Sequence, residues 1–141
     1  MPRLLAVVLT VGSAAWVAFL LAAAVVPEPG LAVLVHEFAA AVCHQRPERS
    51  FAIDARPLAV CARCFGLYLS GAAGAVVAWT GGRSVPRHSR MLLLVTAAPT
   101  IATIPIEWLG FSPLSNAIRA AAALPFGAAA GWSFVRALRA E

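Results

Sequence analysis

The chain has 141 residues, of which 61% are hydrophobic and 12% are charged, whereas a soluble domain has about 45 to 50% apolar and about 25% charged residues. This composition excludes a soluble enzyme, a coiled coil and a disordered chain, because so few polar side chains cannot cover the surface of a small soluble fold. The net charge of +5 comes from 11 arginines, with no lysine, against 6 acidic residues. In a membrane protein such charge orients helices, so we expect a lipid bilayer as partner and no nucleic acid.

Four apolar runs predict an all-α polytopic helix bundle, a single membrane domain of residues 1–141. A helix that crosses the hydrocarbon core needs about 20 residues, and the runs that reach this length are residues 4–26, 57–80, 91–109 and 114–138. The first run is longer than the roughly 7 to 15 apolar residues of a signal peptide, so we expect an uncleaved helix. Pro113 suits the start of the fourth helix.

A shorter apolar stretch, residues 31–43, lies between the first two predicted spans. With about a dozen residues it is too short to span, so it predicts an interfacial or re-entrant helix. Small residues spaced four apart also predict close helix packing in lipid. These are Gly66, Ser70 and Gly74 in the second span, with Gly127 and Gly131 in the fourth. The sequence leaves open whether the protein forms a homo-oligomer.

The arginines predict the orientation, because cytoplasmic flanks of membrane helices carry an excess of positive charge. With a cytoplasmic amino terminus, six arginines lie on the cytoplasmic side: Arg3, Arg83, Arg87, Arg90, Arg136 and Arg139. The other five then lie on the opposite side: Arg46, Arg49, Arg56, Arg63 and Arg119. We therefore expect a multi-pass protein of the cell membrane with both termini in the cytoplasm.

Three thiols and an imidazole are concentrated between the Cys43-His44 pair and a Cys-x-x-Cys motif at Cys61 and Cys64. Three cysteines and one histidine form a tetrahedral donor set that zinc prefers. Neighbouring helical side chains point about 100° apart, so His44 and Cys43 do not easily reach one ion. His36, seven residues before Cys43, lies on nearly the same helix face. We predict a zinc site of Cys43, Cys61 and Cys64 with either His44 or His36.

Redox chemistry is the alternative for the same thiols. Cys61 and Cys64 would cycle between dithiol and disulfide, with Arg63 favouring the thiolate and Cys43 as resolving partner. The predicted orientation puts them on the extracytoplasmic side, where disulfides persist. Free cysteines also occur as small hydrophobic residues in packed helices, which is the plainest interpretation.

Charged residues inside predicted spans are costly and mark candidate functional sites. Glu107 falls near the outer end of the third span, and Arg63 and Arg119 near the outer starts of the second and fourth. We predict that they share one outer-leaflet polar pocket with the cysteines and His44. Glu107 and Arg119 suggest a third class of function, a small transporter or lipid-binding protein. Alternatively, the two form an ion pair that staples two helices.

The chain resembles a family of small prokaryotic integral membrane proteins known as a domain of unknown function. Residues 43–51 match its Cys-His-Gln-x-Pro-x-Arg-Ser-Phe pattern, and the matching positions that follow are Cys61, Arg63, Cys64, Gly66 and Tyr68. In the later segment the corresponding positions are Glu107, Asn116, Arg119, Gly127 and Gly131, with Glu107-Trp108 where the family has Asp-Gly. The resemblance implies a polytopic membrane protein and no particular activity.

Overall fold

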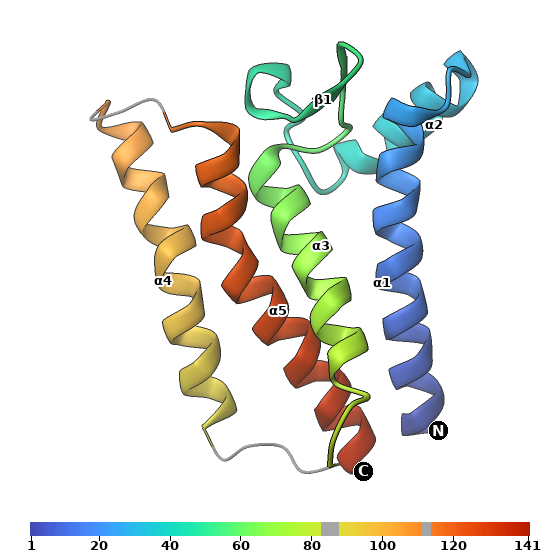
Figure 1. Cartoon of the computed structure of the whole chain (residues 1–141), viewed down its shortest axis with the longest axis vertical. Coiled ribbons are helices and arrows are strands. Elements are labelled where there is room, and N and C mark those ends of the chain that lie inside the picture. Colours follow the sequence, from blue (N-terminus) through green and yellow to red (C-terminus); the bar gives the residue numbers. More distant parts are fainter. Residues whose placement is uncertain (83–87, 111–113) are drawn as a thin grey trace.

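The computed structural model describes residues 1–82, 88–110 and 114–141. The elements in chain order are α1 (Pro2–Val25), α2 (Pro29–Ala40), the 3-10 turn η1 (Pro47–Arg49), β1 (Ala52–Ile53), β2 (Arg56–Pro57), α3 (Ala62–Val77), α4 (Ser89–Trp108) and α5 (Asn116–Ala140). Helices α1, α3, α4 and α5 run side by side, and α2 and the strands lie together at one end (Figure 1). Both termini lie at the opposite end, where Met1, Arg3 and Arg139 line a common hollow.

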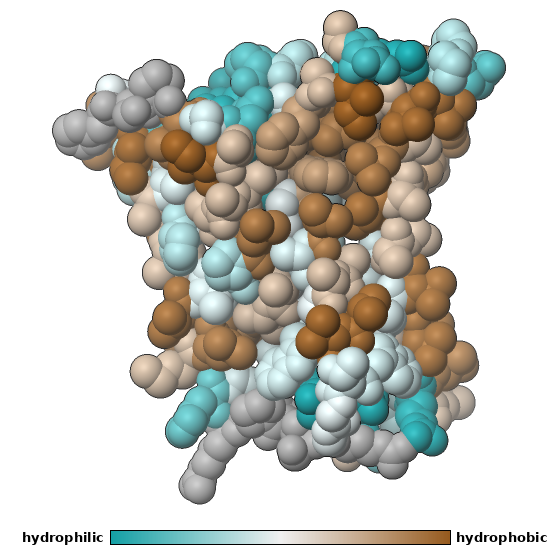
Figure 2. Space-filling model, viewed as in Figure 1, coloured by the Kyte–Doolittle hydropathy of each residue, from teal (hydrophilic) through white to brown (hydrophobic). Residues whose placement is uncertain are grey.

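Three helices, α1, α4 and α5, are long and apolar enough to cross a bilayer. Their outward side chains include Leu94 and Ile101, which are 74% and 62% exposed in the isolated chain. Figure 2 shows mostly apolar residues over the middle of the bundle and the most hydrophilic residues at its two ends. A belt of apolar surface between polar ends is the pattern expected of side chains that face lipid. The predicted all-α membrane bundle is therefore confirmed.

The predicted span over residues 57–80 is wrong in its extent. Its helix, α3, has 16 residues and rises about 24 Å at about 1.5 Å per residue, short of the roughly 30 Å hydrocarbon core. Residues 58–60 are buried but not helical, and Arg56 and Pro57 form β2. Hydropathy reports how far an apolar stretch runs and not its backbone conformation. The expected count of four spanning helices is therefore not confirmed.

The other predicted boundaries agree better. The spans predicted at 4–26, 91–109 and 114–138 correspond to α1, α4 and α5 with ends that differ by at most two residues. The short helix predicted at 31–43 is α2, which ends earlier, at Ala40. The predicted helix start at Pro113 lies outside the described residues, as do Arg83 and Arg87. Helix α5 begins at Asn116, where the Ser115 hydroxyl accepts a hydrogen bond from the Ile118 N–H at 3.3 Å.

The most extensive helix contact joins α3 and α5, and the predicted small residues form it. A Cβ atom on Gly66 would lie 2.6 Å from the Ala120 carbonyl oxygen, and one on Gly131 would overlap the backbone of Gly71. The two backbones approach this closely because neither glycine carries a side chain. The prediction of close packing through these residues is confirmed, and it fixes the position of α3, the helix that begins beside the cysteines.

An apolar cluster supports that end of the bundle. Its buried members include Leu20 of α1, Val35 of α2 and Val60 of the non-helical segment before α3. Cys43 and Cys64 pack against this cluster, together with aromatic side chains that include Trp16 and Tyr68. Burial of these apolar groups holds α1, α2 and the start of α3 together.

Candidate functional site

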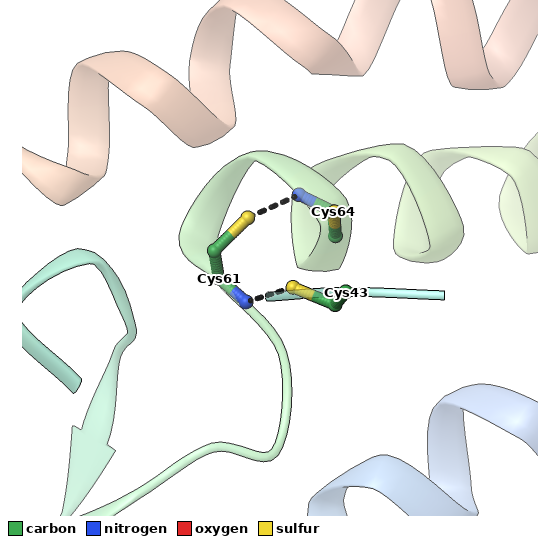
Figure 3. A group of neighbouring side chains, drawn as sticks. All are labelled: Cys43, Cys61 and Cys64. Carbon is green, nitrogen blue, oxygen red and sulfur yellow. Dashed lines mark hydrogen bonds between the residues drawn. The ribbon is translucent and has the colours of Figure 1, made fainter. Parts of the chain in front are cut away.

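The three cysteines meet at the start of α3 (Figure 3). Cys43 follows α2, Cys61 is the N-cap of α3, and Cys64 lies in the first turn of that helix. Their sulfur atoms all lie within 4.8 Å of one another, and all three thiols are free. We call this group the thiol cluster.

The side chain of Gln45 helps to bring Cys43 next to Cys61. Its amide nitrogen donates hydrogen bonds to the carbonyl oxygens of His36 at 2.6 Å and Ala59 at 3.0 Å. These bonds join α2 to the non-helical segment that precedes Cys61. Gln45 has a φ of 51°, and this left-handed backbone turns the chain sharply just after Cys43.

A two-residue hairpin returns the chain from Cys43 toward Cys61. Asp54 and Ala55 have φ values of 49° and 64°, the conformation of a type I′ turn, whose twist suits short antiparallel strands. Ala52 pairs with Pro57, and the N–H of Leu58 donates to the Phe51 carbonyl at 2.8 Å. The sequence analysis did not predict this hairpin, because no Asn-Gly or Asp-Gly pair marks it.

Backbone N–H groups point at two of the sulfurs. The Cys61 N–H donates to Sγ of Cys43 at 3.2 Å, and the Cys64 N–H donates to Sγ of Cys61 at 3.5 Å (Figure 3). Cys61 precedes α3, and a hydrogen bond from the Cys64 side chain is the main cause that lowers the pKa of its thiol from 9.0 to about 5, although burial opposes it. The N-terminal end of a helix favours a thiolate in the same way. The arrangement therefore suits thiolate chemistry.

The histidines lie outside the thiol cluster. Among the described residues, which include all three histidines, the group of close metal-type ligands contains no imidazole. His44 is exposed, and its Nδ1 accepts a long hydrogen bond, 3.4 Å, from the Arg46 N–H. His36 is half-buried on α2, and His88 is exposed next to α4. The choice between His44 and His36 as a ligand remains a prediction.

Glu107 lies between two arginines in a second polar group. One of its carboxylate oxygens accepts from Nη2 of Arg63 at 2.9 Å and the other from Nε of Arg119 at 2.5 Å. Thr103 Oγ1 also accepts from Arg63 at 3.0 Å, and Asn116 Oδ1 accepts from Nη1 of Arg119 at 2.7 Å. These five side chains, from α3, α4 and α5, form what we call the arginine–glutamate network.

The network also reaches the segment between Cys43 and Cys61. The Asn116 amide donates to the Ser50 carbonyl at 2.8 Å, so α5 is tied to the connection that follows the first cysteine. Sequence reasoning gave no role to Gln45 or Thr103, because a polar side chain that bonds to a distant carbonyl or hydroxyl leaves no signal in spacing or periodicity.

The thiol cluster and the arginine–glutamate network use different sides of the first turn of α3. Cys61 and Cys64 meet Cys43 near α1 and α2, whereas Arg63, between them in sequence, bonds to Glu107 of α4. The sequence analysis predicted one pocket for all of these side chains. The structure instead forms two groups from them, which suits a helix, where successive side chains point about 100° apart.

A family model described as "Predicted membrane protein (DUF2085)" matches residues 43–133, well over half of the chain. The chain belongs to this family. The DUF2085 match begins at Cys43 and includes every residue of the thiol cluster and of the arginine–glutamate network, whereas α1 and α2 precede it. Both polar groups therefore lie in the part of the chain that corresponds to the family.

The curated relatives are also uncharacterized. An uncharacterized protein of Methanocaldococcus jannaschii is 50% identical over 36 residues, which are 26% of this chain and 23% of that protein. An uncharacterized protein of Methanothermobacter thermautotrophicus is 28% identical over 86 residues, 61% of this chain and 78% of that protein. The chain thus spans less than a quarter of the length of the first relative. No solved structure matches this DUF2085 protein significantly.

Proposed function

We propose that this DUF2085 protein binds a transition-metal ion, most suitably zinc, through Cys43, Cys61 and Cys64. The observation that supports the proposal is the mutual separation of the three sulfurs, at most 4.8 Å. Zinc–sulfur bonds of about 2.3 Å in a tetrahedral site require sulfurs about 3.8 Å apart, so a small movement of side chains completes the geometry. The N–H groups directed at Cys43 and Cys61 would stabilise the thiolates that a metal requires.

We propose a histidine as the fourth ligand. His44 adjoins Cys43, and its side chain is exposed and has one long hydrogen bond to give up. His36 lies on α2, which Gln45 ties to the segment before Cys61. Either imidazole would complete the Cys3His set of a closed structural zinc site.

In this proposal the metal holds the connection between Cys43 and Cys61 against the helix bundle. The middle of that connection has little apolar contact of its own, since η1 has no buried residue and Ala52 and Ile53 of β1 are exposed. Metal–ligand bonds would supply the folding free energy that a core cannot. The biological role would then depend on the shape of this end of the protein.

A membrane thiol oxidoreductase is the second candidate, and the low pKa of Cys61 favours it, because thiolates attack disulfides. The step would convert the thiols of Cys61 and Cys64 to a disulfide, with two electrons and two protons passing to an acceptor such as a quinone. The same low pKa serves metal binding, so this observation alone does not separate the two functions.

Metal analysis combined with a count of free thiols separates them. Protein prepared without chelators should contain about one zinc ion per chain. Cys43→Ser, Cys61→Ser and Cys64→Ser should each abolish it, because the loss of one thiolate ligand removes most of the affinity of such a site. The ligand histidine is found by comparing His44→Asn and His36→Asn with His88→Asn, the matched control. Metal-free protein with a reversible disulfide between Cys61 and Cys64 would refute the metal proposal and support the redox function.

A further inference from the structure

The arginine–glutamate network carries more positive than negative charge. Arg63 and Arg119 are permanently protonated, and Glu107 supplies one carboxylate between them. The exposed fractions of the side chains are 22% for Arg63, 11% for Arg119 and 5% for Glu107. A net positive charge that is largely removed from water is costly unless an anion neutralises it.

The network also has a donor to spare. Nη2 of Arg63 bonds to Glu107 and Thr103, but its Nε is buried and has no hydrogen-bond partner within the described ranges. A buried guanidinium N–H without an acceptor costs free energy. An ion pair that only joins two helices accounts for the contacts of Glu107, but it leaves the remaining positive charge without a partner.

Two helix starts add to the positive potential. Arg63 lies in the first turn of α3 and Arg119 in the first turn of α5, and the N-terminal end of a helix carries partial positive charge. Both helices begin at the end of the bundle that holds the strands (Figure 1). Arginine pairs recognise oxyanions through forked N–H groups.

We propose that Arg63 and Arg119 bind an oxyanion of the phosphate type, from a lipid headgroup or free in solution. Glu107 holds the two guanidinium groups in position, and the bound anion neutralises the remaining charge. The binding does not depend on the proposed metal centre, which lies on the other side of the first turn of α3.

The test measures the unfolding temperature of protein in a phosphate-free, non-ionic detergent. Inorganic phosphate and short-chain phosphatidylglycerol are added separately, with sodium chloride at the same ionic strength as the reference. Wild-type protein should be stabilised saturably by at least one of them. Stabilisation by phosphate identifies a free anion as a sufficient ligand, whereas stabilisation by phosphatidylglycerol alone identifies a lipid headgroup.

Variants test whether Arg63 and Arg119 cause the stabilisation by the added anion. Arg63→Gln and Arg119→Gln should each weaken the apparent affinity about tenfold or more, because each removes a charge-assisted hydrogen bond. Arg90→Gln is the control, because it removes an equal charge from the exposed surface of α4 at the other end of the bundle. This variant should change the apparent affinity less than about twofold. If Arg119→Gln does not fold, Arg119→Lys should give a smaller loss, since lysine keeps the charge without the fork.

Glu107→Gln distinguishes anion binding from a purely structural ion pair. Glutamine keeps one oxygen as an acceptor between the two guanidinium groups but removes the negative charge, so the affinity for the added anion should increase while metal content remains that of the wild type. Two results would overturn the proposal. One is wild-type protein that neither ligand stabilises saturably, and the other is an affinity that Arg63→Gln, Arg119→Gln and Arg90→Gln change equally.

Discussion

At the scale of single residues, Cys61 connects the other two cysteines. Its N–H donates to the sulfur of Cys43, and its own sulfur accepts from the N–H of Cys64. As the N-cap of α3 it occupies the position where helix N–H groups lack partners inside the helix. A cysteine at this point therefore gains its hydrogen bond from the start of the helix itself.

The lowered pKa of Cys61 gives a pH-dependent prediction. In metal-free protein one thiol should ionise with a midpoint near the pKa of about 5 instead of 9.0. Since the folded pKa is the lower one, this ionisation stabilises the fold increasingly as the pH rises from 5 toward 9, and the contribution disappears as the pH falls through 5. The ultraviolet absorbance of thiolate, followed against pH, measures it.

The matched variant for that titration is Cys61→Ser. It should remove the low-pH step in thiolate absorbance, because no other side chain takes the place of its sulfur beside Cys64. A step that persists unchanged in Cys61→Ser would show that the low pKa belongs to another thiol.

The sequence was enough to predict the cysteines and the charged residues of the two polar groups, but not the directions in which their side chains point. The motif spacing was enough to single out Cys43, Cys61 and Cys64 as one group, and Glu107 and Arg119 as partners. The sequence could not show that Arg63 bonds away from the cysteines, because its direction depends on where α4 lies. Nor could it identify the amide of Gln45 as the link to Ala59, since that contact exists only in the folded chain.

At the scale of elements, the contact of α3 with α5 determines the position of the thiol cluster. Glycines on both helices permit this contact, so a larger side chain at one of them should weaken it. Gly131→Leu should destabilise the protein by about 2 kcal/mol or more, because a side chain there overlaps the backbone of Gly71 and overpacking typically costs about 1 to 3 kcal/mol. Thermal or denaturant unfolding in detergent measures the change.

Gly12→Leu in α1 is the control for this prediction. A Cβ atom on Gly12 has nothing within 4 Å, so the variant has the same gain in helix propensity without the overlap. Equal stability losses at Gly12 and Gly131 would contradict the close contact of α3 and α5.

Elements with a long apolar run were predictable, and those set by tertiary contacts were not. The limits of α1, α4 and α5 follow from apolar length and from flanking prolines, glycines and polar residues. The segment before α3 is equally apolar, yet it is not helical, because its backbone bonds to Phe51 and Gln45. The hairpin between β1 and β2 was missed for a similar reason, since its turn uses alanine at a positive φ.

At the scale of the whole molecule, the two ends of the bundle differ in the polar groups that they hold. The termini lie together at one end, with Arg3, Arg90, Arg136 and Arg139 in elements that begin or finish there, and the thiol cluster and the arginine–glutamate network lie toward the other (Figure 1). The orientation that we propose from the arginines puts the termini in the cytoplasm.

Two reporters test this orientation. A fluorescent protein that folds only in the cytoplasm, fused after Glu141, should fluoresce, and an epitope inserted between Asp54 and Ala55 should be accessible to antibody on cells with a permeable outer envelope but an intact cell membrane. The turn is a suitable insertion point because both residues are exposed. A dark fusion together with a protected epitope would reverse the orientation.

The contact of α3 with α5 also sets an order of events during synthesis. Helix α3 is made before α4 and α5, so its glycine-lined face has no partner until the ribosome has translated α5. The hydrogen bond from Asn116 to Ser50 also cannot form before α5 is made. Because membrane helices insert first and associate afterwards, the contacts of α5 with α3 and with Ser50 form late, after the membrane-insertion machinery has received α5.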